Sequence, residues 1–167
     1  MTKLIVDLDG TLLRLQTDWL QLKSYLAKNF SYDSNLALDE NLFSLKKRDQ
    51  KLFQSLLPKI AEFEQHLLSS APLNSTLVKQ LQKSEWALWT ANTRATAEAA
   101  VKIMELQPLM IVAKEDVNDP KPAPEGLQKI VRQMAWPPAN CLVIGDSKND
   151  AAAARAAGIA FQLVNSF

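Results

Sequence analysis

One stretch decides how this chain is interpreted: Lys3-Leu4-Ile5-Val6-Asp7-Leu8-Asp9-Gly10-Thr11-Leu12. Its first residues are apolar and β-prone, which predicts a buried strand, and the glycine predicts that the strand ends there. Successive side chains of a strand point to opposite faces, so Asp7 and Asp9 are expected on the same side. Two carboxylates held that close repel each other unless one is protonated or a cation lies between them. A simple turn, in which the aspartates bond to backbone amides, is the alternative, so the rest of the chain has to decide.

The composition is that of an ordinary folded domain. The chain has 167 residues, 47% of them apolar and 22% charged, which suits one domain with at most a modest insert. A net charge of +1 gives no broad attraction for nucleic acid or an anionic membrane. Cys141 is the only cysteine, so neither a disulfide framework nor a cysteine-rich zinc site is expected. No apolar run approaches the ~20 residues that span a bilayer, and the first strand begins too early for a signal peptide, so a cytoplasmic location is expected.

A block of helical periodicity follows the first strand. Apolar side chains recur at helical spacing between about residues 15 and 70, and no strand pattern interrupts them. Trp19, Leu22 and Leu26 are an example of such a stripe. Pro58 is expected to begin a new helix, because the first turn of a helix tolerates its missing N–H.

Strands and helices alternate from about residue 71 onward. The strands are expected at residues 86–90, 109–113, 141–145 and 160–164, with helices between them. This alternation predicts an α/β protein with a mainly parallel, five-stranded sheet that helices cover on both faces. The core domain would comprise residues 1–14 and 71–167, and residues 15–70 would form a small all-helical cap inserted after strand one. Such an insert would lie over the sheet edge where open α/β sheets bind ligands.

Polar side chains follow the carboxyl ends of the expected strands. In a parallel sheet these ends lie at one edge, so acidic side chains, a hydroxyl and an ammonium group should surround one crevice. Such groups suit a divalent cation with oxygen ligands together with a phosphoryl group. The residues are Asp7 and Asp9 after the first strand, Thr90 after the second, Lys121 beyond the third, and Asp146 with Asp150 after the fourth.

At these positions the chain resembles the haloacid dehalogenase (HAD) superfamily, whose four motifs occur here in the same order. They are Asp7-Leu8-Asp9-Gly10-Thr11-Leu12, the strand ending in Thr90, Lys121-Pro122-Ala123-Pro124, and Gly145-Asp146-Ser147 with Asp150. The third motif and the helical insert are similar to the phosphoglycolate phosphatase-like branch with a C1-type cap. The resemblance implies a Rossmann-like, three-layer core and a phosphatase acting on a small phosphomonoester, such as phosphoglycolate or a sugar phosphate.

The resemblance also implies roles for the acidic residues. Asp7 would be the nucleophile that forms an aspartyl-phosphate, and Asp9 would protonate the leaving group and then deprotonate water. Mg²⁺ would be held by Asp7, Asp146 and the backbone carbonyl of Asp9. Asp150 would support the waters of the metal, or Lys121, from outside the ligand set.

Further roles concern the phosphoryl group itself. Thr90 would donate its hydroxyl to a phosphoryl oxygen, and Lys121 would stabilise Asp7 and the charge on the equatorial oxygens. The family usually has asparagine directly after the hydroxyl residue, whereas Ala91 intervenes here. The positions expected around the substrate phosphate are Gly10, Thr11 and Asn92.

Simpler interpretations of some residues stay open. Ser147 and Asp150 also fit a helix capping box, which needs no catalytic role. Lys114 and Lys148 compete with Lys121 for the cationic role, and only the Pro-Ala-Pro context favours Lys121.

The tryptophans carry structural expectations. Trp86 and Trp89 are expected to pack on the two faces of the sheet. Trp19 is either part of the cap core or a wall of the substrate site, and the sequence does not separate these two interpretations.

Alternative functions differ in what they require of the site. A phosphomutase uses the same two aspartates but keeps water away from the aspartyl-phosphate, and nothing in the insert distinguishes it. A catalytically silent binding protein on the same fold is a further alternative, although every chemical position is filled. A receiver-type signalling domain is disfavoured, because its phospho-accepting aspartate should end a middle strand, whereas Ala113-Lys114 ends the third one here. The expected partner is a small phosphorylated metabolite, with no nucleic acid or membrane.

Overall fold

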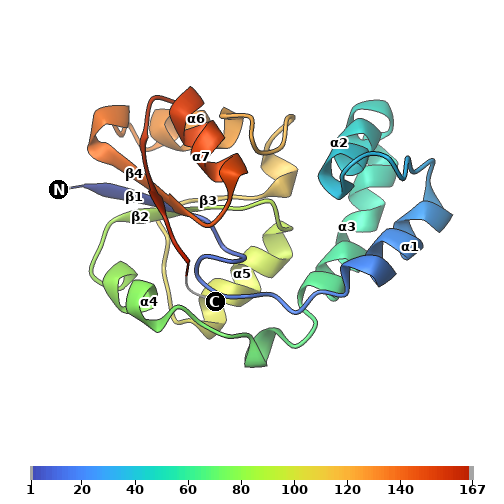
Figure 1. Ribbon diagram of the computed structural model, residues 1–167, viewed down its shortest axis with the longest axis horizontal. Helices are drawn as coiled ribbons and strands as arrows, with labels where there is room; N and C mark the ends of the chain where they lie inside the picture. The colour runs from blue at the N-terminus through green and yellow to red at the C-terminus, as the bar shows by residue number, and fades with distance from the viewer. Residues whose placement is uncertain (1, 166–167) are drawn as a thin grey trace.

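A five-stranded, all-parallel sheet forms the centre of the protein (Figure 1). The computed structural model describes residues 2–165. The order of the strands is β3-β2-β1-β4-β5, so β1 lies in the middle and pairs with β2 and β4. The predicted fold class is confirmed. The strands are β1 (Lys3–Val6), β2 (Trp86–Trp89), β3 (Ile111–Val112), β4 (Cys141–Gly145) and β5 (Ala160–Leu163).

Helices cover both faces of the sheet. On one face lie α4 (Ser75–Leu81) and α5 (Arg94–Ile103), and on the other lie α6 (Glu125–Gln133) and α7 (Lys148–Ala156). As predicted, Trp86 is buried in one apolar layer and Trp89 in the other. Their odd spacing along the strand explains why they point to opposite faces. Short 3₁₀ turns complete the core at Leu68–Ser70, Lys114–Asp116 and Pro138–Asn140.

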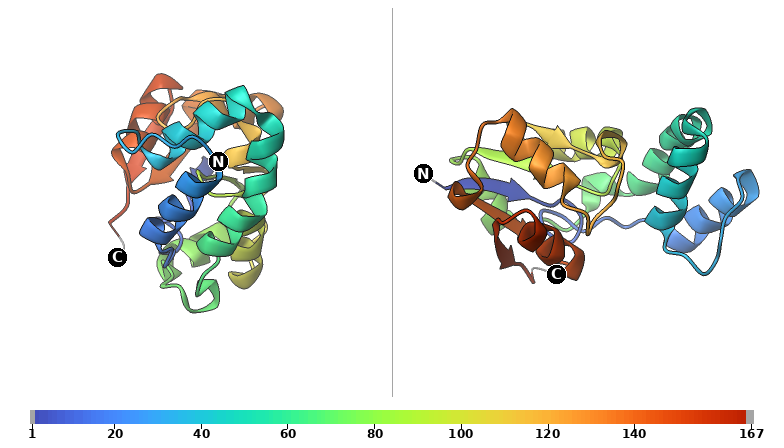
Figure 2. Two further views of the ribbon diagram at one scale, coloured as in Figure 1. Left: turned by 90° about the vertical axis from the view of Figure 1, so that its right-hand side faces the viewer. Right: turned by 90° about the horizontal axis from the view of Figure 1, so that it is seen from above.

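The block inserted after β1 is a lobe of three helices. They are α1 (Trp19–Asn29), α2 (Leu38–Arg48) and α3 (Gln50–Glu64). Figures 1 and 2 show the lobe beyond the carboxyl ends of the strands, where the predicted cap should lie. The lobe has an apolar core of its own, in which Leu22, Phe53 and Ile60 are fully buried. None of the helices in residues 2–165 is both long and apolar enough to span a bilayer.

Pro58 is the clearest error of the sequence interpretation, because it lies inside α3 and does not begin a helix. The helix starts eight positions earlier, where the side chain of Asp49 accepts a hydrogen bond from the amide of Leu52 (2.9 Å). Proline removes one helical hydrogen bond, but its ring lies on the exposed side of α3. Leu57 and Ile60 on either side are buried in the cap core, and this packing keeps the helix continuous.

Candidate active site

The register of β1 and β4 brings Asp7 and Asp146 together. The amide of Asp7 donates to the carbonyl of Ile144 (3.0 Å), so Asp7 continues the ladder between the two strands. Asp150 in the first turn of α7 completes a cluster in which one carboxylate oxygen of each aspartate lies within 4.8 Å of the others. The hydroxyl of Thr11 lies 3.3 Å from Asp7 Oδ2 and 3.5 Å from Asp146 Oδ1. A cluster of carboxylate oxygens is the donor set that hard divalent cations prefer.

Lys121 bridges two of the three carboxylates. Its Nζ lies 2.5 Å from Asp7 Oδ1 and 2.8 Å from Asp150 Oδ1, and it also donates to the carbonyl of Trp89 (3.2 Å). The ammonium group stands 3.9 Å from the centre of the Trp89 ring, a cation–π contact. The structure therefore brings Lys121 to Asp7, whereas Lys148 is exposed.

Burial and mutual repulsion shift the pKa values of this cluster. Burial raises the pKa of Asp7 to about 7, although the attraction of Lys121 opposes the shift. Burial also raises the pKa of Asp146, and the charge of Asp150 adds to this effect. Burial alone would raise the pKa of Asp150 too, but Lys121 and the hydrogen bonds of Ser147 hold it below its usual value. The site thus holds more negative charge than Lys121 neutralises, which a divalent cation would relieve.

The capping box of α7 is confirmed, and Asp150 uses its two oxygens differently. Oδ2 accepts from the hydroxyl (2.5 Å) and the amide (3.1 Å) of Ser147, while Oδ1 pairs with Lys121. A Cβ on Gly145 would lie 2.8 Å from the Asp150 carboxyl group, so the glycine permits this approach. Helix capping and the contact with Lys121 therefore coexist.

Thr90 and Asn92 form a small hydrogen-bonded turn after β2. The hydroxyl of Thr90 donates to Asn92 Oδ1 (2.9 Å) and accepts from the Asn92 amide (3.0 Å). Gly10 adopts a left-handed φ of 82°, and a Cβ there would lie 2.2 Å from Asp146 Oδ2. The hydroxyl of Thr11 is directed at carboxylates in this structure, so its predicted contact with the substrate phosphate, like those of Gly10 and Asn92, stays a prediction.

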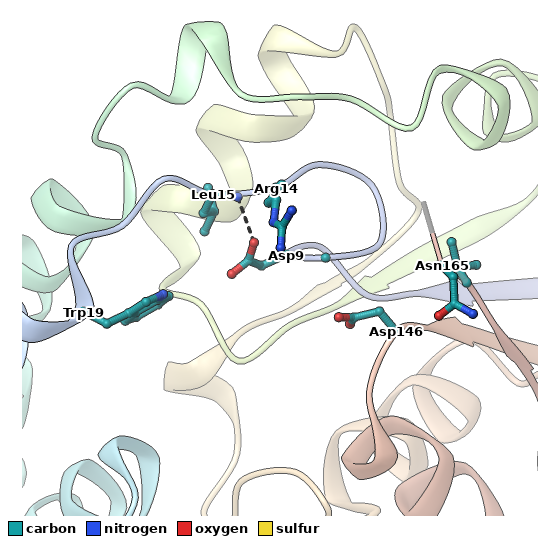
Figure 3. Close-up of a pocket in the computed structure, with 8 residues that line it drawn as sticks. Asp9, Arg14, Leu15, Trp19, Asp146 and Asn165 are labelled. Atoms are coloured by element: carbon teal, nitrogen blue, oxygen red, sulfur yellow. Dashed lines mark hydrogen bonds between the residues drawn. The ribbon is translucent and has the colours of Figure 1, made fainter. Parts of the chain in front are cut away.

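The side chain of Asp9 lies outside the carboxylate cluster. Its Oδ1 accepts a hydrogen bond from the amide of Leu15 (2.8 Å), the dashed line in Figure 3. Burial raises the pKa of Asp9 and this hydrogen bond partly opposes it. The acid–base role of Asp9, and its backbone carbonyl as a metal ligand, stay predictions.

A cleft separates the cap from this edge of the sheet. It consists of two pockets of about 320 and 280 Å³, and both are lined by Asp9, Trp19 and Asp146. Figure 3 shows the first pocket, whose lining also includes Arg14 and Asn165. Trp19 therefore forms a wall of the cleft and is not part of the apolar core of the lobe, while its contact with a substrate stays a prediction.

Polar contacts between cap and core were not predicted. The buried Lys114, which the sequence offered only as a competitor of Lys121, lies 3.0 Å from Asp39 in the first turn of α2. Burial would lower the pKa of Lys114, but the carboxylates of Asp39, Glu64 and Glu115 together raise it. Lys46 donates to the carbonyls of Glu115 (2.8 Å) and Val117 (2.6 Å). A lysine two residues after β3 was a visible signal, whereas nothing in the sequence pattern indicated which residue of the inserted helices it contacts.

Glu64, the last residue of α3, also lines the cleft and was not predicted from the sequence. One oxygen, Oε2, accepts from the amide (2.9 Å) and the hydroxyl (2.6 Å) of Thr93 at the start of α5. These hydrogen bonds connect the last residue of α3 to the N-terminus of α5, which follows the turn of Thr90 and Asn92.

We expect Gly126→Ala to lower both stability and activity. A Cβ at position 126 would lie 2.3 Å from Nε1 of Trp89, so the indole that supports Lys121 has to move. Overpacking of this kind costs about 1–3 kcal/mol, which outweighs the roughly 1 kcal/mol gained in helix propensity. Urea unfolding measures the change in stability, and a turnover assay measures the change in activity. Gly158→Ala is the control, because only its left-handed φ of 68° is strained and no atom lies within 4 Å, so stability should fall without loss of activity.

Fold and site together define a class of protein: a Rossmann-like α/β core with an acidic, lysine-bridged site beneath a helical lobe. Residues 4–164 match the haloacid dehalogenase-like hydrolases, and the chain belongs to this family. The resemblance carried by the four motifs is thereby confirmed.

Individual proteins are similar to this chain over nearly its whole length. Pyrophosphatase PpaX of Bacillus cereus (strain AH820) is 26% identical over 171 residues, which cover 92% of this chain and 78% of PpaX. A hydrolase from Pseudomonas syringae, solved by crystallography, is 26% identical with a TM-score of 0.67 and covers 99% of this chain and 85% of its own. CbbY from Rhodobacter sphaeroides, crystallised with phosphate, is 18% identical with a TM-score of 0.70 and covers 100% and 88%.

Proposed function

We propose that this protein is a Mg²⁺-dependent phosphatase that hydrolyses a small phosphomonoester through an aspartyl-phosphate on Asp7. The observation that carries the proposal is the cluster of Asp7, Asp146 and Asp150, bridged by Lys121, at the bottom of the cleft beneath the cap. Family membership supports the hydrolase, and the acidic cluster supports the metal.

The residues present fit a magnesium ion. All available ligands are carboxylate or carbonyl oxygens, which Mg²⁺ prefers. The raised pKa values of Asp7 and Asp146 show that negative charge is unfavourable here without a further cation. Asp7 and Asp146 would hold the ion together with the carbonyl of Asp9, while Asp150 remains engaged with Ser147 and Lys121. When bound, the ion would neutralise charge on the carboxylates and on the phosphoryl oxygens.

Four side chains then have separate roles in the reaction. A carboxylate oxygen of Asp7 forms a bond to phosphorus as the bond to the ester oxygen breaks, and Asp9 gives that oxygen a proton. The raised pKa of Asp9 favours the protonated form that this step needs. Lys121 balances the charge on Asp7 and the phosphoryl oxygens, and the hydroxyl of Thr90 donates to one of them. Asp9 next takes a proton from water, which attacks phosphorus and frees Asp7.

The cap excludes bulk water during these steps. We propose that residues 15–70 move as one unit on the core of residues 1–14 and 71–167, and that Trp19 closes the cleft over the phosphoryl group. The contacts of Lys114 and Lys46 stabilise the closed arrangement.

A panel of phosphate compounds tests the proposal. Phosphoglycolate, several sugar phosphates and, because relatives are named pyrophosphatases, inorganic pyrophosphate are incubated with Mg²⁺ or with EDTA, and released phosphate is measured. We expect release from at least one phosphomonoester that requires Mg²⁺, and none from Asp7→Asn purified in parallel. Interconversion of sugar phosphates without release would indicate a phosphomutase. Binding of phosphate compounds without any turnover would indicate the silent binding protein.

A further inference from the structure

Glu64 presents a buried carboxylate oxygen that has no hydrogen-bond partner in the described part of the chain. The residue is 1% exposed, and both donors of Thr93 go to its Oε2. The other oxygen, Oε1, is buried and has no partner within residues 2–165. A buried charged acceptor without a donor is costly, so such groups in native proteins usually meet a ligand or an ordered water.

This residue belongs to the same pocket as the proposed nucleophile. The pocket of about 280 Å³ is lined by Asp7 and Lys121 at the sheet edge, and by Glu64, Lys114 and Asp39 on the side of the cap contacts. A phosphoryl group at Asp7 would therefore direct the alcohol part of its ester into the remaining space, which Glu64 borders.

The charges around that space select among alcohols. Lys114 is the cation on this side of the pocket, and its ammonium group is already paired with Asp39. Glu64 is hydrogen-bonded only by the neutral donors of Thr93, and its charge acts together with that of Asp39 to raise the pKa of Lys114. Two carboxylates therefore face one ammonium group on this side of the pocket. A carboxylate on the substrate would meet repulsion here, whereas a hydroxyl group can donate to Glu64 Oε1.

We propose that Glu64 is a specificity-determining residue, which accepts a hydrogen bond from a hydroxyl group on the alcohol part of the substrate. The substrate class is then a hydroxylated phosphomonoester, and not a phosphorylated carboxylic acid. This inference rests on the proposed phosphatase function where it is tested by kcat/KM. Where it is tested by Kd values, it depends only on the position of Glu64 in the pocket.

Glu64→Gln separates this role from a structural one. The amide of Thr93 needs an acceptor, so the carboxamide oxygen of glutamine takes the place of Oε2 and its NH₂ takes the place of Oε1. The variant thus keeps the contact with α5 and replaces an acceptor with a donor at the cleft. Glu115→Gln is the matched control, since both Glu115 oxygens accept from the next amide of α5, Arg94 N, and Glu115 does not line the pocket.

The experiment compares phosphate esters that differ only at the end of the alcohol. Esters with alcohol parts of two to four carbons end in a hydroxyl, a carboxylate or a methyl group, and kcat/KM is measured with Mg²⁺. We expect the hydroxyl ester to exceed the other two by about tenfold or more at the best chain length. In Glu64→Gln the ratio of hydroxyl to carboxylate ester should fall about tenfold, while Glu115→Gln leaves it unchanged. Thermal unfolding confirms that both variants fold.

Several results would overturn the inference. If Glu64→Gln changes all three esters by the same factor, Glu64 is only a structural contact or holds a water. If the wild type prefers the carboxylate ester, the charge argument is wrong. Absence of turnover with every ester would refute the phosphatase but not this inference, because Kd values of the same esters for Asp7→Asn and Asp7→Asn/Glu64→Gln still report the selectivity. Equal Kd ratios in the two backgrounds, or no binding of any ester, would refute it.

Discussion

Replacing Asp7 with asparagine is expected to abolish turnover and yet, without metal, to stabilise the protein at pH 8. The variant carries a neutral carboxamide in place of the carboxylate nucleophile, so phosphate release should fall by about 10³-fold or more. Activity is lost, but the free energy of unfolding should rise, because burial raises the pKa of Asp7 from 3.8 to about 7. Above this value the folded wild type holds a buried carboxylate that unfolding would release into water.

The dependence on pH follows from the same shift. Between about pH 4 and 7 the folded state keeps a proton on Asp7 that the unfolded chain loses, so the free energy of unfolding falls as pH rises. Asparagine removes this dependence and should gain about 1–3 kcal/mol over the wild type at pH 8, an amount that shrinks toward pH 4. Urea unfolding in EDTA at several pH values measures the difference. Asp119→Asn, which alters an exposed ion pair with Lys47, is the control and should change little. A destabilised Asp7→Asn at pH 8 would contradict the account.

Lys121→Met is expected to have the second large effect, this time lowering both activity and stability. Methionine approximates the length of the side chain but leaves Asp7 and Asp150 buried without their shared cation. Removing one partner of a buried ion pair costs about 3–5 kcal/mol at pH 8 without metal, and loss of the charge should lower kcat by about 10²-fold or more. The stability loss should be smaller at pH 5, where Asp7 is protonated, and Mg²⁺ should restore part of it at pH 8.

Lys148→Met is the matched control for this variant. Lys148 is an exposed lysine in the first turn of α7, close in sequence to Asp146 and Asp150. Its replacement should change the unfolding free energy by no more than about 0.5 kcal/mol. Equal effects of the two substitutions would show that general electrostatics, and not the contacts of Lys121, stabilise the cluster.

The core and the carboxylate cluster were predictable because both depend on local patterns. Apolar runs indicated the strands, and parallel strands place their carboxyl ends at one edge, so Asp7 and Asp146 had to meet once β1 and β4 became neighbours. The capping box of Ser147 and Asp150 was equally local, since it needs only residues three apart.

The contacts of the cap were not predictable in the same way. The partner of Lys114, Asp39, comes from a helix whose position on the core depends on how the cap docks as a whole. Glu64 likewise ends a helix whose length was misjudged at Pro58, because packing of the cap core overrides the local preference of proline. The strand β3 was overestimated at residues 109–113, since an edge strand with one neighbour leaves the ladder after Val112.

The pairing of β1 with β4 has a consequence for how this protein tolerates change. The distance between Asp7 and Asp146 depends on a ladder between adjacent strands, and not on the long polypeptide that connects them. Insertions and deletions in the three-helix lobe would alter what enters the cleft without altering that spacing. Changes in the length of this lobe can therefore alter substrate preference while the arrangement of the acidic cluster stays the same.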